Sequence, residues 1–346
     1  MKVQRGVAVI TVLLALAIAV LISSEVIMRV YTGMKRSQNH FDSQQAMQYA
    51  LGGEAWARQR LAMDLEKDKK QLQIDHFREE WAMPAQKLEI EGGSLEIEIY
   101  DMQSRFNLNN LIDENGTIVQ EQARLFNNLL AYLGITTTYT DMAARWASYA
   151  DDTDNLYDSE KFPYRAANTQ FGSVSELRQL RDMEMRDYQK MMPFLSALPD
   201  PVKININTAS EPVLAALVGS GTQTHERIMQ FIQRRAEQEN GFNSPGIFIS
   251  MMGIQDNELA ELLSVNSEYF EVRVVAEYNG RRVWLISTLY RDAETGEISL
   301  LSRDTSRRFV FGNSAFANRS KKKASDDGTD DGKKDKDDKA NSRDKN

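Results

Sequence analysis

The sequence predicts an α+β fold in which a long N-terminal helix packs on an antiparallel sheet, with a large all-α domain inserted into that sheet. Apolar residues recur at helical spacing through the first 65 residues. Two distant stretches, residues 84–103 and 266–312, contain the alternation of apolar and polar residues that is typical of strands with one buried face. Between them, residues 104–265 read as a series of helices, so the helical domain interrupts the sheet.

The N-terminal segment predicts a single membrane span. A short head with two cations, residues 1–6, is followed by an uncharged apolar run. A helix needs roughly 20 apolar residues to cross the hydrocarbon core, and residues 7–28 supply them if Glu25 lies at the membrane interface. Lys2 and Arg5 precede the run and favour a cytoplasmic N-terminus.

A removed secretory signal is the competing interpretation of this segment. Ala15-Leu16-Ala17 has the small-x-small pattern of a signal cleavage site. The apolar segment before it is too short, however, and more apolar sequence follows where a polar mature start is expected. The segment is therefore predicted to stay on the chain as an anchor.

Residues 29–65 are predicted to form the periplasmic half of the same helix. Gly52-Gly53 weakens the helix locally but does not end it. The apolar positions with helical spacing are Val30, Met34, Phe41, Met47, Leu51, Ala55 and Leu61.

Two hairpins are predicted in the sheet. Residues 88–100 alternate apolar and acidic residues around a Gly-Gly pair. Residues 271–290 form two strand-like runs around Asn279-Gly280, which is a strong signal for a two-residue hairpin turn.

The inserted domain is divided into two predicted helical subdomains, residues 104–200 and 201–265. Within the first, Ser173 precedes Glu176 by three residues, which predicts a capping box at a helix start.

The last segment, residues 313–346, is predicted to be a disordered charged tail. From residue 318 on it contains no Val, Ile, Leu, Met or aromatic residue. Such a segment buries too little apolar surface to offset the entropy of the chain.

Composition excludes several classes of function. The chain has no cysteine, so it carries no disulfide framework and no thiolate site. Its net charge of −8 argues against a general nucleic-acid binder. The three histidines, His40, His76 and His225, are scattered, and no zinc-protease, P-loop or serine-hydrolase motif is present. We therefore expect no enzymatic activity.

The N-terminal junction resembles the leader of type IV prepilins. Arg5-Gly6-Val7 stands directly before the apolar helix. In that family a membrane peptidase cuts after the glycine, so the resemblance implies that prepilin peptidase cleaves between Gly6 and Val7. The fifth residue after the cut is Thr11, where pilins usually carry a glutamate. This departure implies an atypical, minor subunit.

Further stretches are similar to the K class of minor pseudopilins of the type II secretion system, also called general secretion pathway protein K. That class typically lacks the glutamate that Thr11 replaces. The resemblance covers roughly residues 1–311 of the chain. The stretches that carry it, beyond the leader, are residues 101–109, 163–168, 173–178 and 204–210.

The resemblance implies a type IV pilin-like fold and a role in assembly. Minor pseudopilins of this class sit at the tip of the pseudopilus with the minor pseudopilins of the I and J classes and other pseudopilins. They help to initiate the filament that exports folded proteins across the outer membrane. The implied location is the bacterial inner membrane, crossed once, with the N-terminus cytoplasmic and the C-terminal domain periplasmic.

An acidic loop, residues 151–160, is a candidate calcium site. Calcium takes six to eight oxygen ligands from carboxylates, carbonyls and water. The K class binds calcium in its helical domain, so the resemblance favours such a site here. The loop is shorter than the usual family version and lacks the EF-hand glycine and closing glutamate, and a merely solvated acidic loop is the alternative. The candidate ligands are Asp151, Asp152, Asp154, Asp158 and Glu160.

A rival interpretation is a membrane-anchored periplasmic DNA-uptake receptor. Residues 205–211 resemble the opening of helix-hairpin-helix modules, in which glycine-turn amides and basic side chains bind phosphates. Gly219-Ser220-Gly221 offers such a turn. Residues 201–265 carry more acidic than basic residues, however, and a negative module repels DNA. We therefore expect no nucleic-acid partner, and interpret the segment as a structural scaffold.

Overall fold

The computed structural model describes residues 4–68, 73–84, 86–149, 157–159, 162–219, 221–254, 258–309 and 311. The chain divides into two compact units, residues 1–309 and 310–346. All the described helices and strands belong to the first unit. The predicted tail, residues 313–346, lies outside the described residues.

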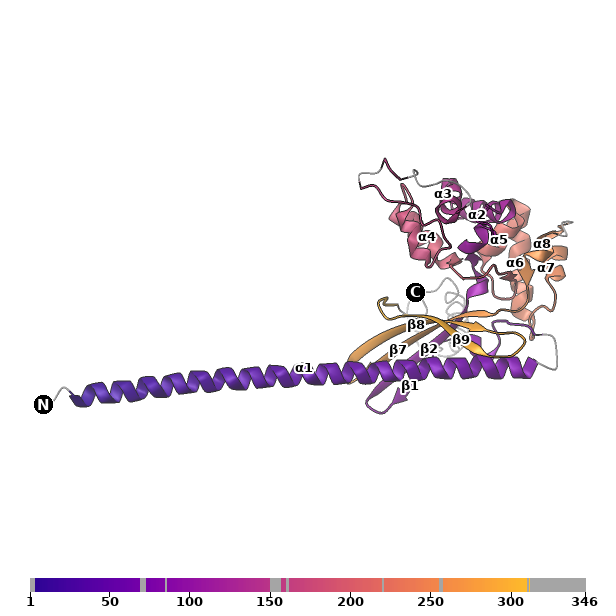
Figure 1. Cartoon of the computed structure of the whole chain (residues 1–346). Helices are drawn as coiled ribbons and strands as arrows, with labels where there is room; N and C mark the ends of the chain where they lie inside the picture. The colour runs from indigo at the N-terminus through magenta and orange to yellow at the C-terminus, as the bar shows by residue number, and fades with distance from the viewer. Residues whose placement is uncertain are drawn as a thin grey trace, which may run out of the picture. The chain divides into compact units, whose positions relative to one another are not determined.

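Helix α1 spans Gln4–Asp68 without a break over 65 residues. Every side chain from Val7 to Phe41 is exposed. From Asp42 onward one face is buried, because small and apolar residues with helical spacing, such as Ala46, Ala50 and Ala57, meet the sheet. The helix therefore has an unburied first part and a packed second part (Figure 1).

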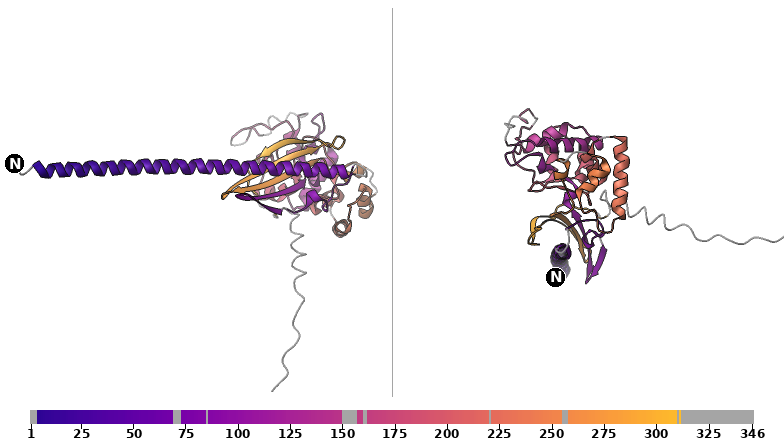
Figure 2. Two further views of the ribbon diagram at one scale, coloured as in Figure 1. Left: turned by 90° about the horizontal axis from the view of Figure 1, so that it is seen from below. Right: turned by 90° about the vertical axis from the view of Figure 1, so that its right-hand side faces the viewer.

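The main sheet is antiparallel, with the strand order β1-β2-β7-β8-β9. Figure 2 shows α1 running across one face of it. β2 and β7 pair in the middle of the sheet, although more than 160 residues separate them in the chain. The predicted α+β fold, with a helical domain inserted into the sheet, is thus confirmed. The strands are β1 (Gln86–Ile90), β2 (Gly93–Asp101), β7 (Tyr269–Tyr278), β8 (Arg281–Arg291) and β9 (Ile298–Asp304).

Alternation of apolar residues determines which face of the sheet meets α1. Val272, Val274 and Ala276 of β7 are fully buried against the helix, together with Ile97 and Ile99 of β2. At the predicted hairpin, Asn279 and Gly280 have φ angles of 46° and 77°, as a type I′ turn requires.

A buried carboxylate holds the edge strand β9 on the helix. Both oxygens of Glu54 on α1 accept hydrogen bonds from Arg303 of β9, at 2.7 and 2.8 Å, and Ser287 of β8 donates to the same group at 2.7 Å. Burial alone would raise the pKa of Glu54, but the hydrogen bonds from Arg303 and Ser287 hold it below its ordinary value. β9 ends at Asp304, and Phe309 lies outside any strand.

The inserted domain consists of short helices and four two-residue strands, and it forms its own apolar core. β3 pairs with β4 and β5 with β6, both in parallel. The bounds of its first half are η2 (Met102–Ser104), β3 (Phe106–Asn107), η3 (Leu108–Leu111), α2 (Gln120–Tyr132), α3 (Thr138–Ala147), η4 (Val174–Gln179), α4 (Met185–Met191), η5 (Met192–Phe194) and β4 (Leu195–Ser196). Those of its second half are β5 (Ile204–Asn205), α5 (Glu211–Val218), α6 (Thr222–Glu237), α7 (Pro245–Met252), α8 (Glu258–Glu261) and β6 (Leu263–Ser264).

The capping box predicted at Ser173 is confirmed. The Ser173 hydroxyl accepts from the amide of Ser175, and Glu176 accepts from the amide of Ser173 at 3.0 Å. The segment that follows is a 3-10 helix, η4, rather than the expected α-helix.

Two adjacent glycines of α1 give a matched test of this packing. A Cβ on Gly53 would lie 2.9 Å from Cγ1 of Val274, whereas a Cβ on Gly52 has no neighbour within 4 Å. We expect Gly52→Ala to raise the free energy of unfolding by up to about 1 kcal/mol through helix propensity. Gly53→Ala should lower it, because overpacking costs about 1–3 kcal/mol. Thermal unfolding of the detergent-solubilised chain measures both, and equal shifts for the two variants would contradict the described packing.

Candidate functional site: the apolar half of α1 and the polar hub at its far end

The predicted cleavage junction lies at the start of α1. Gly6 and Val7 both lie in the helix, and Val7 is exposed. The structure does not test cleavage, so this stays a prediction. The helix is long and apolar enough to cross a membrane from Val7 onward.

Thr11, Glu25 and Arg29, which are polar groups in or next to the apolar run, have local partners. The Thr11 hydroxyl donates to the carbonyl of Ala8 at 2.9 Å. Glu25 pairs with Arg29 at 2.8 Å, one turn along the helix, where the apolar run ends. The Thr11 hydroxyl is thus compatible with a lipid environment, and the Glu25–Arg29 pair is compatible with the membrane interface.

At the other end of α1, a buried guanidinium connects three parts of the fold. Arg291, the last residue of β8, is 1% exposed. Its Nη2 atom lies 2.5 and 2.6 Å from the two carboxylate oxygens of Asp75, in the segment after α1, and Nη1 lies 3.5 Å from Asp64 of α1. Nη2 also donates to the carbonyl of Ser267, and the guanidinium stacks over the Phe270 ring. We call the side chains of Asp64, Asp75, Glu79, Asp101 and Arg291 the polar hub.

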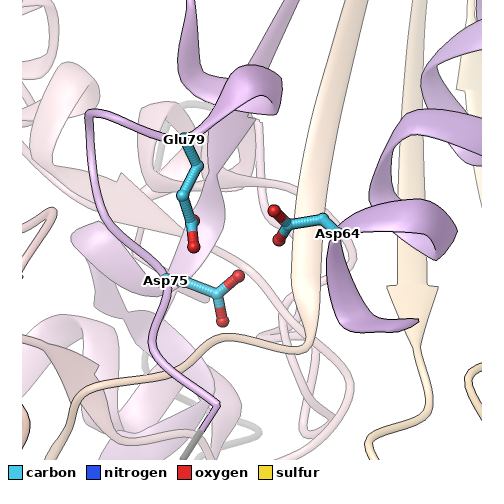
Figure 3. Close-up of side chains that lie close together, drawn as sticks. All are labelled: Asp64, Asp75 and Glu79. Carbon is cyan, nitrogen blue, oxygen red and sulfur yellow. The ribbon is translucent and has the colours of Figure 1, made fainter. Parts of the chain in front are cut away.

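Figure 3 shows that Asp64, Asp75 and Glu79 of the hub point toward one another. Burial, together with the charges of Asp75 and Asp64, raises the pKa of Glu79 to about 9, so this side chain is protonated near neutral pH. Arg291 lies against the two aspartates, so a protein cation already occupies the place of a counter-ion and offsets part of their charge. We therefore interpret the three carboxylates as a structural cluster rather than a metal site.

Asp101 of the hub joins the sheet to the inserted domain. It ends β2 and is fully buried, and its oxygens accept from the Gln103 amide at 2.7 Å and from Ser267 at 2.6 Å. Thr208 and Asn205 of the second helical subdomain donate to the same carboxylate at 2.5 and 3.2 Å. Burial raises the pKa of Asp101 to about 6, although all these donors favour its ionised form.

Buried asparagines explain two of the stretches on which the family resemblance depends. Asn109 donates to the carbonyls of Phe171 and Leu198 and accepts from the amide of Phe171. Asn207 exchanges the same pair of hydrogen bonds with Phe242. Each amide satisfies the backbone of a distant loop that would otherwise be buried without partners. Sequence reasoning selected these segments by their family likeness but did not predict this role.

The predicted calcium loop lies mostly outside the described residues. Asp151, Asp152, Asp154 and Glu160 are not described, and Asp158 is exposed. Tyr157, the residue directly before Asp158, has a well-defined environment. Tyr157 is fully buried, stacks on Tyr164 with ring centroids 4.6 Å apart, and contacts the Trp146 ring edge-on. The aromatic cluster of Trp146, Tyr157 and Tyr164 therefore holds Tyr157, the residue directly before Asp158.

One cation of residues 201–265, the module compared with DNA-binding proteins, has a structural role. Arg235 of α6 is buried and donates to the carbonyls of Ile206 and Ala209 at 2.8 and 2.7 Å. This guanidinium is therefore directed inward and not toward a phosphate backbone.

Two family models match the inserted domain. Both describe the type II secretion system (T2SS) protein K, and they match residues 104–200 and 204–266.

Relatives with the same description cover most of the chain. A type II secretion system protein K of Pseudomonas aeruginosa is 35% identical in an alignment of 319 residues that covers 87% of this chain and 92% of the relative. A protein of that name from Klebsiella pneumoniae is 30% identical and covers 77% of this chain and 86% of its own length. Both relatives carry the name of a secretion protein and neither is named as a DNA-binding protein, so the DNA-uptake alternative finds no support.

A solved structure shares the fold. It is the crystal structure of the GspK-GspI-GspJ complex of the enterotoxigenic Escherichia coli type 2 secretion system. One of its chains matches with a TM-score of 0.65 and 23% identity, over 79% of this chain and 99% of that chain. The likeness confirms the predicted pilin-like architecture with additional helices.

Removing the cation of the polar hub should destabilise the fold strongly. We expect Arg291→Met to lower the free energy of unfolding by about 3–5 kcal/mol, because it leaves buried carboxylates without their counter-charge. Arg282→Met on the same strand is the control. Its ion pair with Glu277 is largely exposed and should contribute less than about 1 kcal/mol. Denaturant titration measures both, and a loss below about 1 kcal/mol for Arg291→Met would contradict the structural role of the hub.

Proposed function

Because this chain belongs to the type II secretion system protein K family and is therefore a minor pseudopilin, we propose that it occupies the tip of the pseudopilus. There it assembles with the minor pseudopilins of the I and J classes and helps to initiate the filament. The GspK homologue with the same fold was crystallised with GspI and GspJ, which supports this choice of partners. The role is structural and not enzymatic.

The observation that carries the proposal is the place where the inserted domain is attached. The polar hub joins it to the C-terminal end of α1, through Asp64, and to the end of β2, through Asp101. Val7 lies roughly 85 Å away along the helix at about 1.5 Å per residue. The insert is thus carried at the end opposite the membrane anchor, where a subunit stacked above would need space. A subunit with this insert therefore fits best at the tip of the filament, where no other subunit is stacked above it.

The apolar half of α1 supports an inner-membrane anchor with the N-terminus in the cytoplasm and the folded domain in the periplasm. Its exposed surface from Val7 to Met28 suits both lipid and the helices of other pseudopilins. Before assembly it would act as the span, and after cleavage behind Gly6 as part of the filament.

Processing can be read directly from the mature N-terminus. We expect mass spectrometry of the chain from a host with prepilin peptidase to show a start at Val7, because cleavage follows Gly6. A Gly6→Asp variant should keep Met1 and fail to support secretion. A wild-type start at Met1 or at Ile18 would contradict the pilin-like leader.

The tip function predicts a specific defect in a strain that lacks this subunit. Folded substrates should accumulate in the periplasm, and secretion should return when the full chain is supplied. The I and J class subunits should copurify with the detergent-solubilised chain. A strain that secretes normally without the chain would contradict the proposed function. If the purified chain carries neither an I nor a J class subunit, only the proposed choice of partners is wrong.

We also propose that the acidic loop, residues 151–160, binds calcium. The carboxylates of Asp151, Asp152, Asp154, Asp158 and Glu160 are hard oxygen donors of the kind that calcium prefers. The exposed Asp158 follows the buried Tyr157, so an anchored backbone would present this carboxylate outward. Bound calcium would offset part of the negative charge of these carboxylates.

Calorimetric titration tests this site. We expect calcium to bind the wild-type chain and to bind far more weakly after Asp152→Ala combined with Asp154→Ala, because two ligands are lost. Asp141→Ala, which removes an exposed aspartate of α3 outside the loop, is the control and should bind as the wild type does. Absence of heat with the wild type would end the proposal.

A further inference from the structure

One edge of the main sheet is left partly open. β8 extends over Arg281–Arg291, but β9 pairs only with its second half, from Ile286 to Arg291. On that side, residues 281–285 of β8 have no strand partner among the described residues.

The backbone groups on this open edge can be assigned from the ladder. The amide of Arg291 donates to Glu268 on the β7 side, so odd-numbered residues of β8 bond to β7. Bonding direction alternates along an antiparallel strand. Arg282 and Trp284 therefore direct their N–H and C=O groups toward the open side. Edge groups that have no partner among the described residues are a template for an added strand.

A hollow of about 430 Å³ lies beside this edge. It has an apolar side, formed by Met47 of α1 and by Val283, and an aromatic side, formed by Trp284. The Trp284 indole N–H donates to the carbonyl of Phe309 at 3.1 Å, which fixes the orientation of the ring. The remaining lining residues are Arg282, Thr305, Ser306 and Arg308.

The rim of the hollow is cationic. Arg308 lies 5.2 Å from the centre of the Trp284 ring, and among the described residues it has no carboxylate partner. Arg282 is paired with Glu277 at 2.5 Å, and Arg281 donates to the amide oxygen of Asn39 rather than to an acid. An extended segment with an acidic residue would therefore complement this edge.

The hollow adjoins the surface of α1 that other subunits would cover. The hairpin before β8 contacts α1 through the hydrogen bond from Asn279 to Asp42. Directly preceding these positions on the helix, Tyr31, Met34 and Phe41 are more than half exposed. A subunit that buries these side chains would bring its own folded domain next to the hollow.

We propose that the open edge of β8 binds an extended, acidic segment of a neighbouring pseudopilin as an added strand. One side chain of that segment enters the hollow between Met47 and Trp284, and its carboxylate lies between Arg282 and Arg308. This mode of binding is β-strand addition, in which main-chain hydrogen bonds give affinity and side-chain pockets give specificity. The inference rests on the proposed function for the identity of the partner.

Site-specific photocrosslinking tests the proposal in cells that make the complete secretion system. The full chain carries p-benzoylphenylalanine at Thr305, which is exposed and lines the hollow, or at Ser299 of β9 as a control. We expect Thr305, but not Ser299, to crosslink to a second pseudopilin, within a segment that contains Asp or Glu.

Two variants separate strand addition from chance proximity. Arg308→Glu reverses the rim charge and should lower the crosslink yield roughly tenfold. Arg282→Pro removes both an outward N–H and a rim guanidinium without breaking the bonds to β7, since proline is tolerated at sheet edges, and should lower the yield at least as much. Arg307→Glu is the matched control, because Arg307 pairs with Asp304 and does not line the hollow. It should leave the yield unchanged.

Three results would overturn the proposal. They are no crosslink from Thr305, a crosslink to residues 312–346 of the same chain, and a crosslink that neither variant weakens. Secretion by the same cells is the separate readout. If the crosslinker variant restores secretion but no partner is captured, the proposal of strand addition is wrong and the proposed function still holds. If secretion never depends on the chain, the proposed function is wrong.

Discussion

The fold depends on a single buried cation, Arg291, and on the carboxylates that surround it. Three parts of the chain meet there: the end of α1 through Asp64, the connecting segment through Asp75, and the last residue of β8 itself. Ser267 bonds to both Asp75 and Asp101 and extends this contact to the inserted domain. An intact ion pair in the interior contributes little net stability, but removal of one partner leaves the other charge buried and uncompensated, so we interpret the hub as a contact that imposes one arrangement.

This constraint gives the subunit two functional ends. One end of α1 exposes mainly apolar side chains and suits lipid or other helices around it. The other end carries a helical domain of more than 150 residues, attached through buried polar contacts rather than through a flexible linker. A pilin-like base can thus join a filament, and in the proposed function the inserted domain limits what can be stacked above it.

Much of this could be predicted from the sequence, because periodicity and turn chemistry are local. The long helix, the hairpin at Asn279-Gly280 and the capping box at Ser173 all follow from neighbouring residues. The polar hub could not be predicted, because Asp64, Asp75 and Arg291 are joined only by tertiary packing. The stretch around Asn109 was recognised by family likeness, but its hydrogen bonds to loops 60 to 90 residues away have no signature in the sequence.

The place of the subunit in the filament is tested most directly by electron microscopy of sheared pseudopili. An epitope in the charged tail, residues 318–346, can be labelled with antibody-bound gold, because all the described helices and strands lie outside this segment. Gold at one end of each filament is the result that a tip subunit predicts. Gold distributed along the filament would show that the inserted domain is accommodated between stacked subunits, and would contradict the tip position.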